Sequence, residues 1–209
     1  GGLMAAFVAM IIGLPTIRLR GLYLAIATLG FGEVVRVIAL NLTITHGALG
    51  FSGIPSMAST LSDYASDWGL LDALEMDSQT GGQFLMCIVL LLIVIAIVTF
   101  WYRLEHSRVG RAMAAVEADE YAASLTGINV VYYKMMAFLF SAFFAGVAGA
   151  LYAHATFFIT PTDFDWHKVV DILLYTVFGG SNVLWGSVLG AAILTIVPES
   201  LRALSEDRD

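Results

Sequence analysis

A carboxylate and a guanidinium lie three residues apart in a stretch that is otherwise apolar. The stretch is Thr28–Arg36, with the sequence TLGFGEVVR, and its charged residues are Glu33 and Arg36. At the centre of a bilayer one charge costs about 2.5–3.5 kcal/mol, and each apolar residue recovers only about 0.3–0.6 kcal/mol. Charged residues in membrane helices therefore face protein or a water-filled cavity. Two interpretations stay open: the two residues pair with each other on one helix face, or they line a path for a polar solute.

Two glycines, Gly30 and Gly32, come immediately before Glu33. Because glycine weakens a helix by about 1 kcal/mol relative to alanine, we expect the apolar helix over Gly21–Leu40 to be interrupted here. Interrupted membrane helices leave backbone groups free only beside protein or water, and transporters use such groups to bind solutes. The sequence therefore predicts a translocation path lined by Thr28, Gly30, Gly32, Glu33 and Arg36.

Other patterns that could carry chemistry are weak. Gly50–Gly53, with the sequence GFSG, matches the Gly-x-Ser-Gly of intramembrane serine proteases, and His154 lies in a later apolar segment. A serine nucleophile needs a base within hydrogen-bond reach, but Ser52 precedes a proline and an acidic segment, which favours a turn outside the membrane. The four histidines lack metal-ligand spacing, and neither lysine follows a glycine-rich loop. We expect no catalytic residue, metal or cofactor, and we expect ATP, if it is used, to bind another chain.

The composition indicates a membrane protein. Of the 209 residues, 59% are hydrophobic and 13% are charged, against about 25% charged in ordinary soluble domains. The formal net charge of −7 provides no basic patch, so we expect no nucleic-acid partner. The single cysteine, Cys87, excludes a disulfide framework and a cysteine zinc site within the chain.

Long apolar blocks predict the membrane-spanning helices. A hydrocarbon core of about 30 Å needs about 20 helical residues. The predicted spans are Gly21–Leu40, Phe84–Trp101 and Met135–Phe158, with Leu3–Leu14 as the remnant of another. A last apolar region, Ile172–Val197, is interrupted by GGSN, and is either one broken helix or a re-entrant piece followed by a span. The predicted fold class is all-α, a polytopic transmembrane helical bundle that forms one domain over residues 1–209.

The distribution of basic residues predicts the orientation. Residues 42–82 contain acidic residues but no Lys or Arg, so we expect an extracytoplasmic acidic loop. Residues 102–134 carry Arg103, Arg108, Arg111 and Lys134, so we expect a cytoplasmic loop.

Small residues recur at helical spacing in the third predicted span. One row is Ser141, Ala145, Gly149 and Ala153, with Ala142, Gly146 and Ala150 beside it, and Gly186 and Gly190 repeat the spacing later. Such rows let membrane helices approach closely. Packing within the chain and packing between subunits both stay open.

The cytoplasmic loop predicts a helix of its own. Roughly four turns fit between Gly110 and Thr126, and Gly127 is a plausible helix-terminating residue. The segment is rich in alanine and carries Glu117, Asp119 and Glu120. It is either a plain connector or a docking element for a cytoplasmic partner.

Several stretches together resemble a known family. They are RLRGLYLAIATLGFGEVVR (Arg18–Arg36), GALGFSGIP (Gly47–Pro55), VGRAMAAVEADEYAASLTGINVVYYK (Val109–Lys134), FSAFFAGVAGALYA (Phe140–Ala153) and LLYTVFGGSNVLWGSVLGAAILTIVPE (Leu173–Glu199). In order and over nearly the whole chain, they resemble the LivM-type permease of branched-chain amino-acid ABC transporters. The acidic segment Thr60–Gly82 has no counterpart in this resemblance.

The resemblance implies a function and a set of partners. It implies a permease subunit, not an enzyme, that imports branched-chain amino acids or related small amino acids and amides. It implies a second, LivH-like permease, cytoplasmic ATPase subunits, an extracytoplasmic solute-binding protein and a bacterial or archaeal plasma membrane. Arg108–Gly127 resembles the ATPase coupling helix, although EYAASLTG has one residue more than the general Glu-Ala-Ala, three residues, Gly pattern. The residues implied in coupling are Arg111, Glu117, Asp119, Glu120 and Gly127.

Two alternatives from other classes remain. A secondary transporter would use Glu33 as an ion or proton site and would need no ATPase. An intramembrane serine protease would need Ser52 as its nucleophile. Because the chain begins without Met and its first apolar block is short, we also expect it to be an N-terminally truncated fragment with further helices upstream.

Overall fold

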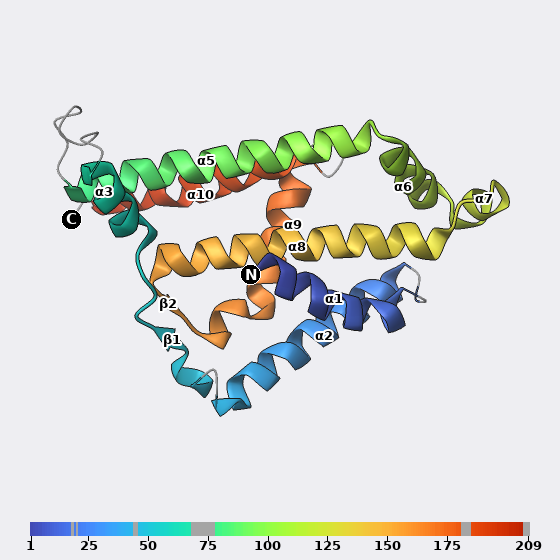
Figure 1. Ribbon diagram of the computed structural model, residues 1–209, viewed down its shortest axis with the longest axis horizontal. Helices are drawn as coiled ribbons and strands as arrows, with labels where there is room; N and C mark the ends of the chain where they lie inside the picture. The colour runs from blue at the N-terminus through green and yellow to red at the C-terminus, as the bar shows by residue number, and fades with distance from the viewer. Residues whose placement is uncertain (18, 20, 44–45, 68–77, 181–184, 207–209) are drawn as a thin grey trace. The chain divides into compact units, whose positions relative to one another are not determined.

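Helices make up most of the described chain in the computed structural model, which describes residues 1–17, 19, 21–43, 46–67, 78–180 and 185–206 (Figure 1). The helices are α1 (Gly2–Thr16), α2 (Leu22–Asn41), α3 (Met57–Asp67), α5 (Ser78–Glu105), α6 (Arg108–Ala118), α7 (Glu120–Leu125), α8 (Val130–Thr156), α9 (Trp166–Gly179) and α10 (Gly186–Glu206). Short 3-10 turns cover Gly47–Leu49 and Pro161–Phe164, and two strands, β1 (Phe51–Ser52) and β2 (Phe158–Ile159), pair antiparallel. The chain divides into two units, Gly1–Pro161 and Thr162–Asp209.

Three helices in the described residues are long and apolar enough to cross a membrane. They cover Tyr23–Asn41, Thr80–Glu105 and Val130–Thr156, so the predicted all-α membrane fold and its three spans are confirmed. The second of these is rich in Ile and Val, which in water favour strands. In a bilayer it is helical because every backbone N–H and C=O must be satisfied within the segment.

The predicted interruption of the first span is wrong. α2 runs as one helix from Leu22 to Asn41, and Gly30 and Gly32 lie inside it. Two glycines weaken a helix by about 2 kcal/mol in total, whereas each backbone group left unsatisfied in hydrocarbon costs several kcal/mol. The backbone requirement outweighs the local propensity, and the helix continues.

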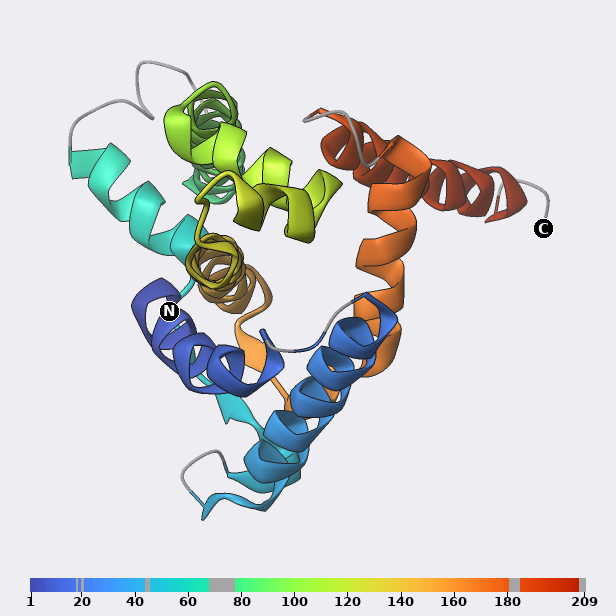
Figure 2. The same ribbon diagram turned by 90° about the vertical axis from the view of Figure 1, so that its right-hand side faces the viewer.

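The predicted break in the last apolar region is confirmed within the second unit. α9 ends at Gly179 and α10 begins at Gly186, with Ser181 and Asn182 of the GGSN stretch outside the described residues. The two helices pack closely: a Cβ at Gly190 would lie 2.2 Å from the Tyr175 carbonyl oxygen. The region therefore forms two packed helices rather than one straight span, and Figure 2 shows them crossing.

The predicted extracytoplasmic loop contains more regular structure than we expected. Residues 42–82 include all of α3 and the beginning of α5, and α3 packs on α5, where a Cβ at Gly82 would lie 2.5 Å from the Ala58 carbonyl oxygen. The segment also carries β1, whose Phe51 pairs with Ile159 of β2. In its described residues the segment thus contains a helix that packs on α5 and a strand that pairs with the segment after α8.

One row of small residues on α8 is used for packing within the chain. α1 lies against α8, and at the closest approach a Cβ at Gly146 would lie 2.4 Å from the Ala5 Cβ. The neighbouring row behaves differently: a Cβ at Gly149 would have no atom within 4 Å, and Ser141 and Ala145 are exposed. The prediction of packing within the chain is confirmed for the row that contains Gly146.

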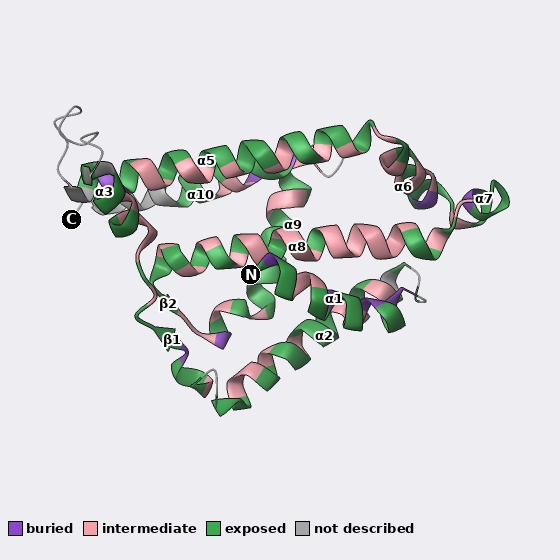
Figure 3. Cartoon of the chain, in the orientation of Figure 1, coloured by how far each residue is buried: buried purple, intermediate pink, exposed green. Residues whose placement is uncertain are grey.

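Little of the apolar surface is buried within the chain (Figure 3). Among the described residues, the buried hydrophobic side chains are Ala9, Ile17, Val116 and Ala123. Large apolar residues of α2, α5 and α8 are exposed, and contiguous apolar surface of this extent marks contact with membrane or protein. This burial pattern agrees with a helical membrane protein.

Candidate functional site

The charged residues of α2 form an ion pair with each other. Arg36 Nε donates to both carboxylate oxygens of Glu33, at 3.1 Å and 3.0 Å, and Arg36 Nη2 also donates to Oε1. The side chains are 21% exposed for Arg36 and 45% exposed for Glu33. This geometry is the i,i+3 pairing of the first interpretation, and it leaves part of the carboxylate accessible from outside the chain.

Four of the five predicted path residues share one face of α2. At about 100° per residue, Thr28, Gly32, Arg36 and Glu33 fall within an arc of about 140°, and Gly30 lies outside this arc. Thr28 Oγ1 donates to the Ala25 carbonyl at 2.9 Å, so its hydroxyl is satisfied within the helix. A Cβ at Gly30 or Gly32 would meet no atom within 4 Å. The face around Gly32 is therefore open in the described chain.

The segment predicted to be a cytoplasmic helix forms two helices rather than the single helix that the sequence predicts. α6 begins at a Ser107 cap, whose Oγ accepts from the Gly110 N–H at 3.1 Å, and ends at Ala118. Asp119 is extended and its carboxylate accepts from the N–H groups of Tyr121 at 2.8 Å and Ala122 at 3.2 Å. The break occurs because an aspartate that caps a new helix satisfies N–H groups that would otherwise have no partner.

The end of α7 agrees with the prediction for Gly127. Its φ is +85°, a conformation that glycine adopts without steric cost. The Gly127 N–H bonds the Ser124 carbonyl at 3.1 Å, and the Ile128 N–H bonds the Ala123 carbonyl at 3.2 Å, which is the Schellman pattern of a helix C-terminus.

The acidic residues of this segment have separate roles. Glu120 pairs with Lys134 of α8, whose Nζ donates to Oε1 at 2.5 Å. Asp119 caps α7, and Glu117 is exposed on α6. Arg111 Nη1 donates to the His106 carbonyl at 2.9 Å and is exposed. Sequence reasoning missed Lys134 as a partner, although it is the only Lys, Arg, Asp or Glu in α8.

The two predicted loops lie at opposite ends of the same pair of helices. α5 leads directly into α6, and α6 and α7 both contact α8 near its start. At the other end α3 contacts α5 and α8, and β2 follows α8 (Figure 1). Residues 102–134 and the described part of residues 42–82 are thus separated by the length of the spans.

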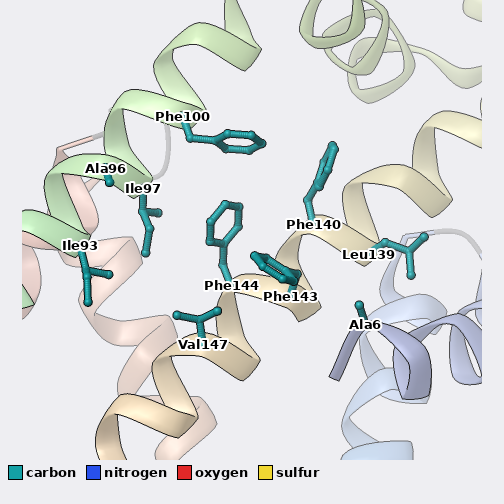
Figure 4. Close-up of a pocket in the computed structure, with 10 residues that line it drawn as sticks. All are labelled: Ala6, Ile93, Ala96, Ile97, Phe100, Leu139, Phe140, Phe143, Phe144 and Val147. Atoms are coloured by element: carbon teal, nitrogen blue, oxygen red, sulfur yellow. The ribbon is translucent and has the colours of Figure 1, made fainter. Parts of the chain in front are cut away.

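An apolar pocket of about 630 Å³ lies between α1, α5 and α8 (Figure 4). Its lining residues are Ala6, Ile93, Ala96, Ile97, Phe100, Leu139, Phe140, Phe143, Phe144 and Val147. Phe100 of α5 contacts two rings of α8, with centroid distances of 5.7 Å to Phe140 and 5.2 Å to Phe144. None of these lining side chains carries a charge or a hydrogen-bonding group, and none belongs to α2.

The structure gives no support to the protease alternative. Ser52 lies in β1 and is exposed, not at the start of a buried helix. Among the described residues there is also no group of three or more His, Cys, Asp or Glu side chains that could hold a metal ion.

These features define a polytopic helical membrane protein with an ion pair in one span and an ordered two-helix segment between two others. The chain belongs to the family described as branched-chain amino acid transport system / permease component, whose model matches residues 1–207. The resemblance to a LivM-type permease is therefore confirmed.

Individual relatives agree with this assignment. The chain is 36% identical over 214 residues to the high-affinity branched-chain amino acid transport system permease protein LivM of Escherichia coli, a match over 98% of this chain and 50% of that protein. It is 35% identical to the LivM protein of Salmonella typhimurium over the same shares. It is also 29% identical over 110 residues to the ribose import permease protein RbsC of Escherichia coli, over 50% of this chain and 34% of that protein. The chain spans about half the length of the LivM proteins it matches, and no solved structure matches it.

Proposed function

We propose that this chain is part of the permease subunit of an ATP-driven importer of branched-chain or related small amino acids. The observation that carries the proposal is the family match over residues 1–207, together with the transport function for which the LivM relatives are named. The sequence has no nucleotide-binding loop, so ATP hydrolysis belongs to separate cytoplasmic ATPase subunits. The proposed membrane is the plasma membrane of a bacterium or an archaeon.

The proposed docking element for the ATPase subunits is the α6–α7 segment. Both of its helices have side-chain N-caps, so the segment is ordered rather than a flexible connector. Arg111, Glu117 and Asp119 are exposed on it, which leaves them accessible to a cytoplasmic partner. Glu120 contributes less to such a surface because its carboxylate is paired with Lys134.

The proposed translocation path runs along the face of α2 that carries Thr28, Gly32, Glu33 and Arg36. At Gly32, where a Cβ would meet no atom within 4 Å, this face is open in the described chain, and a charged pair is not stable against lipid. A second, LivH-like permease subunit would cover the face and enclose the path. An extracytoplasmic solute-binding protein would deliver the amino acid to it.

The function is tested by uptake measurements in cells that lack the gene for this chain. We expect such cells to lose high-affinity uptake of radiolabelled leucine, isoleucine or valine, and the full-length gene to restore it. Depleting ATP with arsenate should abolish uptake, whereas a protonophore should not when glycolysis maintains ATP. Loss of uptake with the protonophore at constant ATP would instead support the ion-coupled alternative.

The proposed orientation is tested by single-cysteine labelling. Cys87 is the only cysteine of these 209 residues, so Cys87→Ser, together with replacement of any cysteine elsewhere in the full-length protein, provides a cysteine-free background. Ser124→Cys in α7 and Ser66→Cys in α3 are a matched pair, since both serines are exposed. A membrane-impermeant maleimide added to intact cells should label the variant at 66 and leave the variant at 124 unlabelled until the cells are opened.

A further inference from the structure

The short helix α7 is fixed to α8 by one ion pair that spans the turn between them. Glu120 is the first residue of α7, and Lys134 is the fifth residue of α8. Their charged groups meet at 2.5 Å across 14 positions of sequence. The Lys134 side chain is 18% exposed and that of Glu120 is 26% exposed. A partly buried pair is screened less by salt than an exposed pair, so this contact holds under physiological conditions.

In the described chain α7 is a short, mostly exposed helix that contacts α6 and α8. α7 has six residues, far fewer than a helix needs to be stable by itself. The segment has a joint at each end: Asp119 is extended where α6 ends, and Gly127 has a φ of +85° where α7 ends. Of the α7 side chains only Ala123 is buried, at 4% exposed. The Glu120–Lys134 pair is the charged contact that bridges the second joint.

The composition of α8 supports a specific role for Lys134. The helix contains no other Lys, Arg, Asp or Glu. Lys134 therefore places a single charge, close to the membrane, in an otherwise uncharged helix. A lysine that only anchors a helix at the interface extends its ammonium group toward water. Here the ammonium group instead turns to the carboxylate of α7 and is largely covered.

We propose that Glu120 and Lys134 are positioning residues that make α7 and the first turns of α8 move together. This inference rests on the proposed function, in which the ATPase moves the α6–α7 segment. The ion pair then makes α8 follow α7, so that the chain does not simply bend at Gly127. Glu120 acts inside the permease and not as a direct ATPase contact. Neither residue touches the transported solute.

The test uses the full-length permease assembled with its partner permease and ATPases in liposomes. The measured quantity is the amount of amino acid transported per ATP hydrolysed, with ATPase rate and subunit assembly measured alongside. Glu120→Gln and Lys134→Met should each lower this ratio at least about fivefold, a typical size for coupling between sites, while assembly stays intact. The exchanged pair Glu120→Lys with Lys134→Glu should restore the ratio to within about twofold of the wild type.

A matched control is Glu105→Gln, which removes the same charge from an exposed position at the end of α5 and should leave the ratio unchanged. Three results would overturn the proposal: no rescue by the exchanged pair, a loss of assembly with Glu120→Gln but not with Lys134→Met, or a normal ratio in both single variants. Wild-type liposomes that show no ATP-dependent uptake would instead refute the proposed function, and the inference with it.

Discussion

The contact between α1 and α8 leads to a prediction that separates packing from helix propensity. Gly146→Ala places a Cβ 2.4 Å from the Ala5 Cβ and 3.0 Å from the Gly1 carbonyl oxygen, whereas ordinary van der Waals contact begins at 3.4 Å. The two helices must therefore move apart by about 1 Å, and overpacking of this kind costs about 1–3 kcal/mol. Replacing glycine in a helix returns about 1 kcal/mol, so the propensity gain offsets only part of the cost.

The matched control is Gly149→Ala on the same helix. A Cβ there would meet no atom within 4 Å, so this variant gains the propensity term without the steric cost. We expect Gly146→Ala to be less stable than Gly149→Ala by about 1–3 kcal/mol. Equilibrium unfolding of the purified protein in mixed micelles of a mild detergent and SDS measures this difference.

The result that would refute the reasoning is a Gly146→Ala variant at least as stable as Gly149→Ala. It would mean that α1 does not lie against α8 at Gly146.

Three further predictions concern α7 and α2. Asp119→Ala removes the cap of α7 at a cost of about 0.5–2 kcal/mol, and amide hydrogen exchange at Tyr121 and Ala122 should become faster, while unchanged exchange would contradict the cap. Gly127→Ala forces a Cβ into a φ of +85°, which costs about 1–2 kcal/mol; protease cleavage between α7 and α8 should increase, and resistance equal to the wild type would argue against this turn. Glu33→Gln should lower leucine uptake about tenfold, because a hydrogen bond to a charged group contributes about 1.5–3 kcal/mol; normal uptake at normal expression would remove Glu33 from the proposed path.

The spans were predictable because membrane helices are specified by continuous apolar sequence. The block within Phe84–Trp101 is long enough by itself to fix α5, whatever its neighbours do. The error at Gly30 and Gly32 came from applying helix propensities that hold in water. In a span, the cost of unsatisfied backbone groups exceeds the propensity of two glycines, so the helix stays continuous.

The details of the α6–α7 segment were less predictable, for two physical reasons. Asp119 lies in an alanine-rich stretch, where helix propensity favours continuation, and only its side-chain hydrogen bonds to Tyr121 and Ala122 decide the break. The partner of Glu120 is 14 positions away, and this pairing exists only because the turn at Gly127 brings α7 back to α8. The Gly127 turn itself was predictable, since it depends on one residue type.

The β1–β2 pairing described above restricts how the ends of two spans can separate. β1 follows α2 and β2 follows α8, and Phe51 and Ser52 are bound to Ile159 and Phe158 through the backbone. Spreading α2 from α8 at that end would break these backbone hydrogen bonds, while in the described chain no strand joins the opposite ends of the same helices. The strand pairing therefore links the segments that follow α2 and α8 and limits how far the two helices can separate at that end.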